Sequence, residues 1–414
     1  MSLDGALNGL LDYCRTEGWK GYDPYDGLNS PLARMLPSKG TAGKVARTVW
    51  IQMLKRSPIN LRPLLGIHKE FNPKGIALAA RAVLILARQP NHQSVSIKPQ
   101  PTGRGDDAER ESDLDHELEF LIRSLTGLRS PGYSEWCWGY NFDWQSRAFY
   151  APRGTPNVVC TVFAALAYLE HYERSGRIRM LDTAESSCRW LLDQINRSED
   201  SGGRRNLFCF SYTPHDHSKV HNVNLLAAEA LARVYAKTGY DEFAEAAARA
   251  AAYSIARQRD DGSWVYGEAQ DQQWIDGFHT GFILTSIQNL VEILGSHEWI
   301  PSLEAGYSFY KENFFLADGR PKYYHDKLYP IDAHSAAVAV VTFVELGRIW
   351  PESFAQAEQV MKWTANNLQD PAGFFYYQMN RLHRIKIPYM RWSQAWMLYA
   401  LAVYFDSVGA SKNG

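Results

Sequence analysis

The sequence lacks several features that would place it in a special class of protein. Its 414 residues include 5 cysteines, and none of these form a CxxC pair. We therefore predict reduced thiols, most of which fill the core. No stretch approaches the ~18 consecutive apolar residues of a membrane-spanning helix, and the first residues show no basic segment of a secretory signal. These absences predict a cytoplasmic protein without a membrane span.

The sequence also lacks an excess of charge of either sign. It has 44 Lys and Arg residues against 45 Asp and Glu residues. This balance gives no electrostatic reason to expect nucleic acid or an anionic membrane as a partner. Because 45% of the residues are hydrophobic and 21% are charged, the chain has the composition of a folded globular protein and not of a disordered one.

Long apolar helical runs dominate what is present. Six such runs begin at Asn72, Gly154, Val220, Trp274, Tyr329 and Ile387. Each run is hydrophobic on nearly every side, which is typical of a helix that is buried all round. Equivalent points in five of the runs are Pro156, His221, Asp276, Asp332 and Met390. Their spacing of roughly 55 to 65 residues indicates an internal repeat.

Amphipathic helices with charged outer faces lie between the apolar runs, for example over residues 44–56, 241–258 and 352–369. Aromatic-rich turns follow several of them, as at 260–268 and 371–378, and indicate short strands or hairpin arms. One such repeat cannot bury its own apolar surface, so neighbouring repeats must share a core. We therefore predict an all-α fold, an (α/α)6 toroid of six inner and six outer helices with short aromatic β-hairpin turns.

The same pattern predicts the domain organisation. Residues 1–44 form an N-terminal helix and ordered coil, residues 45–408 form the toroid, and residues 409–414 form a tail. Residues 89–111 are polar, contain Pro and Gly, and interrupt the repeat. We interpret them as a surface loop, with a lid near the cavity as the functional alternative.

Six helical hairpins with aromatic turns resemble the toroid enzymes that process carbohydrates. These include six-hairpin glycosidases, N-acylglucosamine and cellobiose 2-epimerases, and uronate lyases and C5-epimerases. The resemblance covers about residues 45–405 at the level of architecture, and no diagnostic catalytic motif of one member is matched residue by residue. It implies a saccharide substrate and either glycoside hydrolysis or, as the alternative, epimerase or lyase chemistry.

A second resemblance concerns the sequence Gln258-Arg-Asp-Asp-Gly262-Ser-Trp264. It is similar to the Q-x-x-x-G-x-W repeat of squalene-cyclase and prenyltransferase toroids, and residues 369–375 are a degraded copy. In those proteins the motif is structural and ties an outer helix to the next turn. The sequence has no D-x-D-D motif and no cysteines with zinc-ligand spacing, so a terpenoid-cyclase-like enzyme is the last alternative.

Two aspartates occupy the same repeat position at the start of an inner helix. Asp276 is followed by His279, and Asp332 is followed by His334. Adjacent helices ~8–10 Å apart would hold the two carboxylates at the ~6.5–9.5 Å that an inverting glycosidase uses. We therefore predict these four residues as catalytic, in a hydrolase with paired aspartates. Helix capping and an Asp276–His279 ion pair are the structural alternatives.

The two histidines also permit a different chemistry. A histidine pair across a sugar ring can remove and return a proton next to a carbonyl, and His221, Asn222 and Arg391 suit a uronate. The predicted substrate-binding residues are His221, Asn222, Asn157, Arg391, Trp264, Tyr266, Tyr324, Tyr377, Trp138 and Tyr212. Aromatic rings can stack on the apolar faces of sugars. Core packing is the alternative for at least half of them.

Residues 214–221, PHDHSKVH, hold three histidines and an aspartate. Because no fixed second pair of ligands follows, the metal pattern is weak, and we predict neither a metal nor a cofactor. A toroid that binds a glycan or a protein without turnover is a further alternative. The sequence does not set the oligomeric state.

Overall fold

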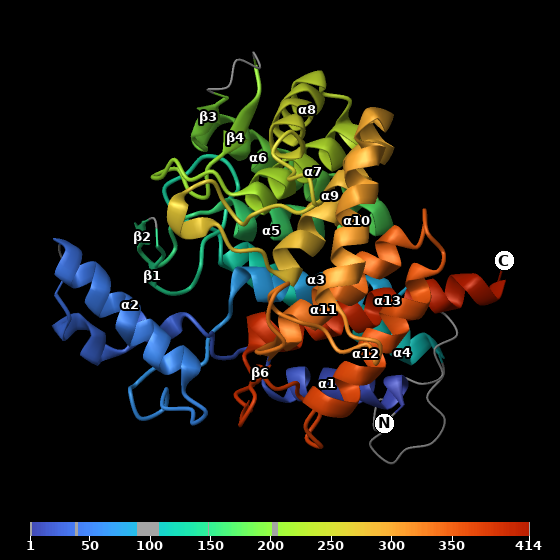
Figure 1. Ribbon diagram of the computed structural model, residues 1–414. Helices are drawn as coiled ribbons and strands as arrows, with labels where there is room; N and C mark the ends of the chain where they lie inside the picture. Colours follow the sequence, from blue (N-terminus) through green and yellow to red (C-terminus); the bar gives the residue numbers. More distant parts are fainter. Residues whose placement is uncertain (1, 38–39, 89–106, 148, 201–205, 414) are drawn as a thin grey trace.

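The computed structural model describes residues 2–37, 40–88, 107–147, 149–200 and 206–413 (Figure 1). Most of the predicted polar loop, residues 89–106, lies outside the described residues. Residues 107–111 begin a helix, α4 (Asp107–Gly127). Among the described residues, no helix is both long enough and apolar enough to cross a membrane.

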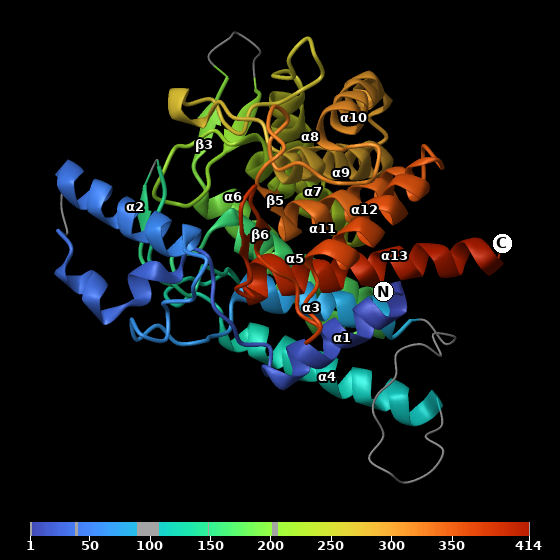
Figure 2. The ribbon, with the colours of Figure 1, turned by 60° about the horizontal axis from the view of Figure 1, so that its bottom comes forward.

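Six inner helices form a closed ring, as Figures 1 and 2 show. They are α3 (Pro73–Leu86), α5 (Val158–Ser175), α7 (His221–Thr238), α9 (Gly277–Leu294), α11 (Ala333–Leu346) and α13 (Ala395–Asn413). Each inner helix packs against the next one, and α13 packs against α3, which closes the ring. Nearly all residues of α3 and α11 are buried, as expected for helices that are apolar on every side. The predicted (α/α)6 toroid is confirmed.

Each of five outer helices packs against the inner helix that precedes it in the sequence. They are α4, α6 (Ile178–Gln194), α8 (Asp241–Ile255), α10 (Ile300–Phe314) and α12 (Ser353–Leu368). Their inner faces are mostly apolar, and that of α8 is also rich in small residues. Its buried face includes Ala246, Ala247, Ala250 and Ala251. Small side chains at this spacing let the two helix layers approach closely.

The N-terminal helix α1 (Leu3–Thr16) takes the sixth outer position, between α12 and α13. The Q-x-x-x-G motif supports this assignment. The side-chain amide of Gln258 donates to the carbonyl of Ser302 in α10 at 2.8 Å, and that of Gln369 donates to the carbonyl of Ala6 in α1 at 2.9 Å. Each glutamine also donates to the carbonyl four residues further on. The motif therefore ties one outer helix to the next, which is the structural role that the resemblance implied.

Helix α2 (Gly40–Arg56) does not pack as an outer helix, although the sequence pattern predicts it as one. It contacts the short 3₁₀ helix η1 (Asp26–Asn29) and strand β1 (Trp144–Gln145), and it stands away from the ring in Figures 1 and 2. With η2 (Pro31–Met35) it belongs to a segment inserted between α1 and α3. The domain boundary at residues 44 and 45 stays a prediction.

Short antiparallel strands hold the aromatic turns. The pairs are β1 with β2 (Tyr150–Ala151), β3 (Arg197–Glu199) with β4 (Phe208–Phe210), and β6 (Gln378–Met379) with both β5 (Ile331–Asp332) and β7 (Arg384–Ile385). Trp144 lies opposite Ala151, and Asp332 lies opposite Gln378. The short 3₁₀ helix η3 (Gln270–Gln272) belongs to one of these turns, η4 (His297–Trp299) connects α9 to α10, and a π-helical turn η5 (Met390–Gln394) precedes α13. All five cysteines are buried and none forms a disulfide.

Candidate functional site

A cavity of about 750 Å³ lies at the end of the ring where the inner helices begin. Thirteen of its 34 lining residues are aromatic, compared with 13% of the whole chain. The aromatic turns and one side of α2 form its walls. A cavity of this size with many aromatic side chains and a few polar groups is typical of a small-ligand site.

The second residue of each of the inner helices α3, α5, α7, α9 and α11, and of the turn η5 that leads into α13, lines this cavity. In each case the N-cap residue lies two positions before the lining residue. The N-cap residues are Asn72, Asn157, Val220, Asp276, Asp332 and Tyr389. The corresponding lining residues are Lys74, Val159, Asn222, Phe278, His334 and Arg391. All six helix N-termini therefore point towards one space, where their partial positive charges favour an anion.

His279 and Asp276 form a hydrogen-bonded dyad at the wall of the cavity. Nδ1 of His279 lies 2.7 Å from Oδ2 of Asp276. Because a carboxylate only accepts, Nδ1 carries the hydrogen, and Nε2 is left free to accept a proton. The imidazole is 19% exposed, whereas the carboxylate is fully buried. Tyr266 packs on the imidazole with ring centroids 4.5 Å apart, so the dyad holds the histidine in one orientation.

His334 is a neutral polar group in an aromatic setting. Its ring lies against Phe278, with centroids 4.6 Å apart, and against Trp392 at 4.5 Å. Burial, with the nearby charge of Lys74, holds the pKa of His334 well below its usual range. Neither ring nitrogen has a hydrogen-bond partner among the described residues. Because a buried polar group without a partner is costly, His334 is suited to bonding a ligand in the cavity.

Lys74 is a cation that the sequence analysis missed. It is 3% exposed, and its Nζ lies over the rings of Phe163, Phe282 and Trp396 at 4.4, 5.4 and 5.1 Å. Burial, reinforced by the positive charge of Arg391, lowers the pKa of Lys74 to about 7. A lysine in this state exchanges a proton readily near neutral pH.

Arg391 also lines the cavity, but its charge is compensated. Nε and Nη2 donate to the two carboxylate oxygens of Asp23 at 2.5 and 2.8 Å. Both side chains are buried, and the guanidinium lies over the ring of Tyr140 at 5.0 Å. The bidentate pair fixes the arginine rigidly and joins the inserted segment to the first turn of the last inner helix.

The two aspartates predicted as a catalytic pair do not line the cavity. Asp276 caps α9, and Asp332 caps α11. Asp276 accepts from Nε1 of Trp274 at 2.8 Å, and Asp332 accepts from Nε1 of Trp392 at 3.1 Å. Burial raises the pKa of Asp332 to about 6. Each carboxylate therefore holds a capped helix and a tryptophan of the cavity wall in place. Their predicted catalytic role stays a prediction.

The other predicted residues divide into two groups. The cavity brings together His279, His334, Asn222, Arg391, Tyr266, Tyr324 and Tyr212. His221, Asn157, Trp264, Tyr377 and Trp138 are absent from its described lining. The physical reasons are local. For example, Trp138 and Trp264 donate to backbone carbonyls, Asn157 caps α5, and Nδ1 of His221 lies 3.3 Å from Oγ of Ser254.

The charge of the lining is one-sided. None of the described residues that line the cavity is Asp or Glu, whereas Lys55, Arg56, Lys74, Arg147 and Arg391 all line it. Of these five, only Arg391 forms an ion pair with a carboxylate among the described residues. Lys55, Arg56 and Arg147, which form no ion pair among the described residues, therefore favour an anionic ligand.

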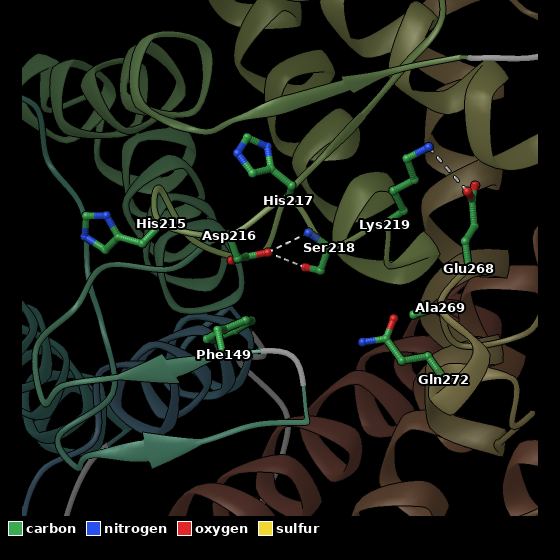
Figure 3. A pocket seen from close by; sticks show the side chains of 9 residues that line it. All are labelled: Phe149, His215, Asp216, His217, Ser218, Lys219, Glu268, Ala269 and Gln272. Atoms are coloured by element: carbon green, nitrogen blue, oxygen red, sulfur yellow. Dashed lines mark hydrogen bonds and ion pairs between the residues drawn. The ribbon is translucent and has the colours of Figure 1, made fainter. Parts of the chain in front are cut away.

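Of the segment 214–221, residues 215–219 line a second pocket of about 520 Å³ (Figure 3). His215 and His217 lie apart there, and Asp216 accepts from the backbone and hydroxyl of Ser218. In the part of the chain that the structure describes, no three His, Cys, Asp or Glu side chains are placed to hold a metal ion. This pocket shares Phe149, Ser218 and Gln272 with the main cavity, so the two adjoin.

No protein-family model matches the sequence, and no curated protein matches it either. Solved structures do match. A glycoside hydrolase family 76 mannosidase from Bacteroides thetaiotaomicron VPI-5482 gives a TM-score of 0.61 at 12% identity, covering 99% of this chain and 98% of that chain. A cellobiose 2-epimerase from Bacillus thermoamylovorans B4167 gives 0.59 at 12% identity, covering 82% and 90%. An unsaturated glucuronyl hydrolase specific for heparin gives 0.54 at 14% identity, covering 80% and 96%.

These similarities confirm the resemblance in architecture to the six-hairpin toroid proteins. At identities this low they show the fold, and the site must be argued from its own residues.

Proposed function

We propose that this protein is a carbohydrate-active enzyme that transfers a proton at a carbon atom of an acidic sugar, as an epimerase or a lyase does. One observation carries the proposal: the described lining holds the imidazole of the His279–Asp276 dyad together with several cations and no carboxylate. The similar structures include sugar hydrolases and epimerases. They support a saccharide substrate without selecting a reaction.

The chemistry follows from the polarity of the site. In a uronate, the hydrogen on C5 lies next to the carboxylate. Nε2 of His279 removes it as a proton, while Asp276 stabilises the imidazolium that forms. The electron pair of the C–H bond spreads onto the carboxylate, where the cations of the lining stabilise the added negative charge. Return of a proton from the other face gives the epimer. Cleavage of the C4–O4 bond, in which O4 leaves together with its substituent and takes up a proton, gives a sugar with a C4–C5 double bond.

The aromatic walls suit the rest of the substrate. Tyr266 and Trp274 stack on one another with centroids 4.4 Å apart, and Trp392 is oriented by its bonds to Asp332. Flat rings of this kind cover the apolar face of a pyranose, and polar groups such as Asn222 and Gln378 remain to bond its hydroxyls.

Hydrolysis by paired aspartates is the competing proposal. The raised pKa of Asp332 is a property of general acids in glycosidases. However, both aspartates are buried in capping and tryptophan hydrogen bonds. Hydrolysis would require them to exchange these bonds for contacts with the substrate and with water.

The experiment that separates these reactions is mass spectrometry after incubation in D₂O with neutral and uronic-acid oligosaccharides. We expect deuterium in an intact uronic-acid substrate, or an unsaturated product, and no reaction of neutral oligosaccharides. Cleaved products without deuterium at carbon and without a new double bond would refute proton transfer and support hydrolysis. If no oligosaccharide changed although several bound, a toroid that binds glycans without turnover would replace both proposals.

A further inference from the structure

The near-neutral charge of the whole chain hides a strongly basic segment. Between Asp26 and Glu70 the sequence contains eight Lys and Arg residues and no Asp or Glu. The rest of the chain therefore carries 36 cationic residues against 45 acidic ones. We call residues 27–69 the basic lobe. It contains η2 and α2, and Figures 1 and 2 both show α2 projecting from the toroid.

Helix α2 has three distinct faces. Ile51 and Leu54 are buried. Thr48, Gln52 and Lys55 line the cavity. The third face carries Val45, Val49 and Met53 at the i, i+4, i+8 spacing of one helical stripe, and each is at least 50% exposed. A stripe of three large apolar side chains in water is unusual for a helix that already has a buried face.

The basic lobe concentrates exposed apolar side chains. The described part of the chain has fourteen large hydrophobic residues that are exposed, and seven of them belong to the lobe. These seven are Leu32, Met35, Val45, Val49, Met53, Ile59 and Leu64. The lobe is one tenth of the chain and holds half of this class, so the clustering is not the ordinary scatter of exposed apolar residues. Arg34 and Lys44 are exposed beside them.

We propose that the basic lobe docks on an anionic lipid surface through the outer face of α2. Apolar side chains on one side of a basic amphipathic helix enter the boundary between headgroups and acyl chains, while Lys and Arg bind the anionic headgroups. Charge complementarity selects this occupant over a second copy of the chain. In a symmetric dimer the same basic surface would face itself and bring like charges together.

Nucleic acid would use the cations but would leave the apolar stripe in water. Because α2 also lines the cavity, docking would hold the mouth of the cavity beside the headgroup layer. The docking surface rests on its own residues and does not depend on the chemistry proposed above.

The test is flotation of the full-length protein with vesicles of phosphatidylcholine alone, and with vesicles in which about one third of the lipid is phosphatidylserine. We expect binding to the anionic vesicles only, weakened by added salt. Val49→Glu with Met53→Glu should abolish binding. Arg34→Gln and Lys44→Gln should each weaken it about fivefold, the effect of one cation near an anionic surface.

The matched control is Ile178→Glu with Arg179→Gln. These residues are exposed at the start of outer helix α6. Because hairpin helices run antiparallel, an outer helix begins at the end of the ring opposite the cavity. Thermal melts show whether each variant is folded. No flotation of the folded wild-type protein, or equal loss in the control, would overturn the proposal. Two other results would also overturn it. In the first, the protein binds no vesicles but forms a dimer that Val49→Glu dissociates. In the second, the protein binds nucleic acid and Val49→Glu does not change this binding.

Discussion

The buried amino group of Lys74 makes the protein less stable at neutral pH than at a pH near 10. In the native state burial lowers the pKa of Lys74 to about 7, and in the unfolded chain it returns to 10.5. At pH 7 the unfolded chain therefore binds more protons than the native state, and stability rises as the pH rises from 7 towards 10.5. At 1.36 kcal/mol per pKa unit, the free energy of unfolding is lower than at a pH above 10.5 by ~4 kcal/mol at pH 7 and by ~2 kcal/mol at pH 9.

Lys74→Met removes this pH-dependent loss of stability and keeps an unbranched side chain among Phe163, Phe282 and Trp396. We expect the difference in free energy of unfolding between the variant and wild type to favour the variant by ~2 kcal/mol more at pH 7 than at pH 9. Urea unfolding followed by tryptophan fluorescence at both values measures this difference. Buried thiols far from Lys74, whose pKa is raised by burial as for Cys188, destabilise both proteins equally as the pH rises. They therefore cancel in the comparison.

The exposed Lys44 provides the control, since Lys44→Met should show no such change with pH. A stability difference between Lys74→Met and wild type that is the same at pH 7 and pH 9 would refute the account. It would show that Lys74 keeps an ordinary proton affinity in the folded protein.

Three further variants test other contacts. Arg391→Met should lower the free energy of unfolding by ~3–5 kcal/mol, because it leaves the Asp23 carboxylate buried without its partner. Removal of both side chains should restore part of this loss. A double variant as unstable as Arg391→Met alone would contradict the pairing. Gln369→Ala should lower the free energy of unfolding by ~1–3 kcal/mol and increase amide exchange in α1, whereas Gln258→Ala should increase it in α10. If each variant increased exchange in all helices alike, the motif would not link neighbouring helices. Asp276→Asn should keep the melting temperature within a few degrees and lower turnover ~10²–10⁴-fold, and unchanged turnover would limit this residue to helix capping.

The ring could be predicted from the sequence because its cause is local. Helices such as α3 and α11 are apolar on every side, and only a closed ring buries six of them together. The position of α1 could not be predicted in the same way. Its contacts with Gln369 bridge the two ends of the chain, and the inserted residues before α3 break the repeat that would have revealed it.

The candidate site was predicted in part, and the position of the two aspartates outside the cavity lining has a clear physical origin. The sequence alignment placed Asp276 and Asp332 at the cavity because they are the first polar residues of their helices. A capping side chain, however, turns back to the free backbone N–H groups of its own helix. The side chain two positions later faces the cavity. This rule finds His334 and Arg391, which were predicted, and Lys74, which was not, because it is a single cation at the start of an apolar run.

The most direct test of the central claim locates the exchanging hydrogen. After incubation of a uronic-acid substrate in D₂O, NMR should show deuterium at the carbon next to the carboxylate with wild-type protein and with His215→Gln, a histidine of the adjoining pocket. His279→Gln should show none, with an unchanged melting temperature. Exchange that persists in His279→Gln, or product formed by wild-type protein without any exchange or double bond, would contradict proton transfer by this histidine.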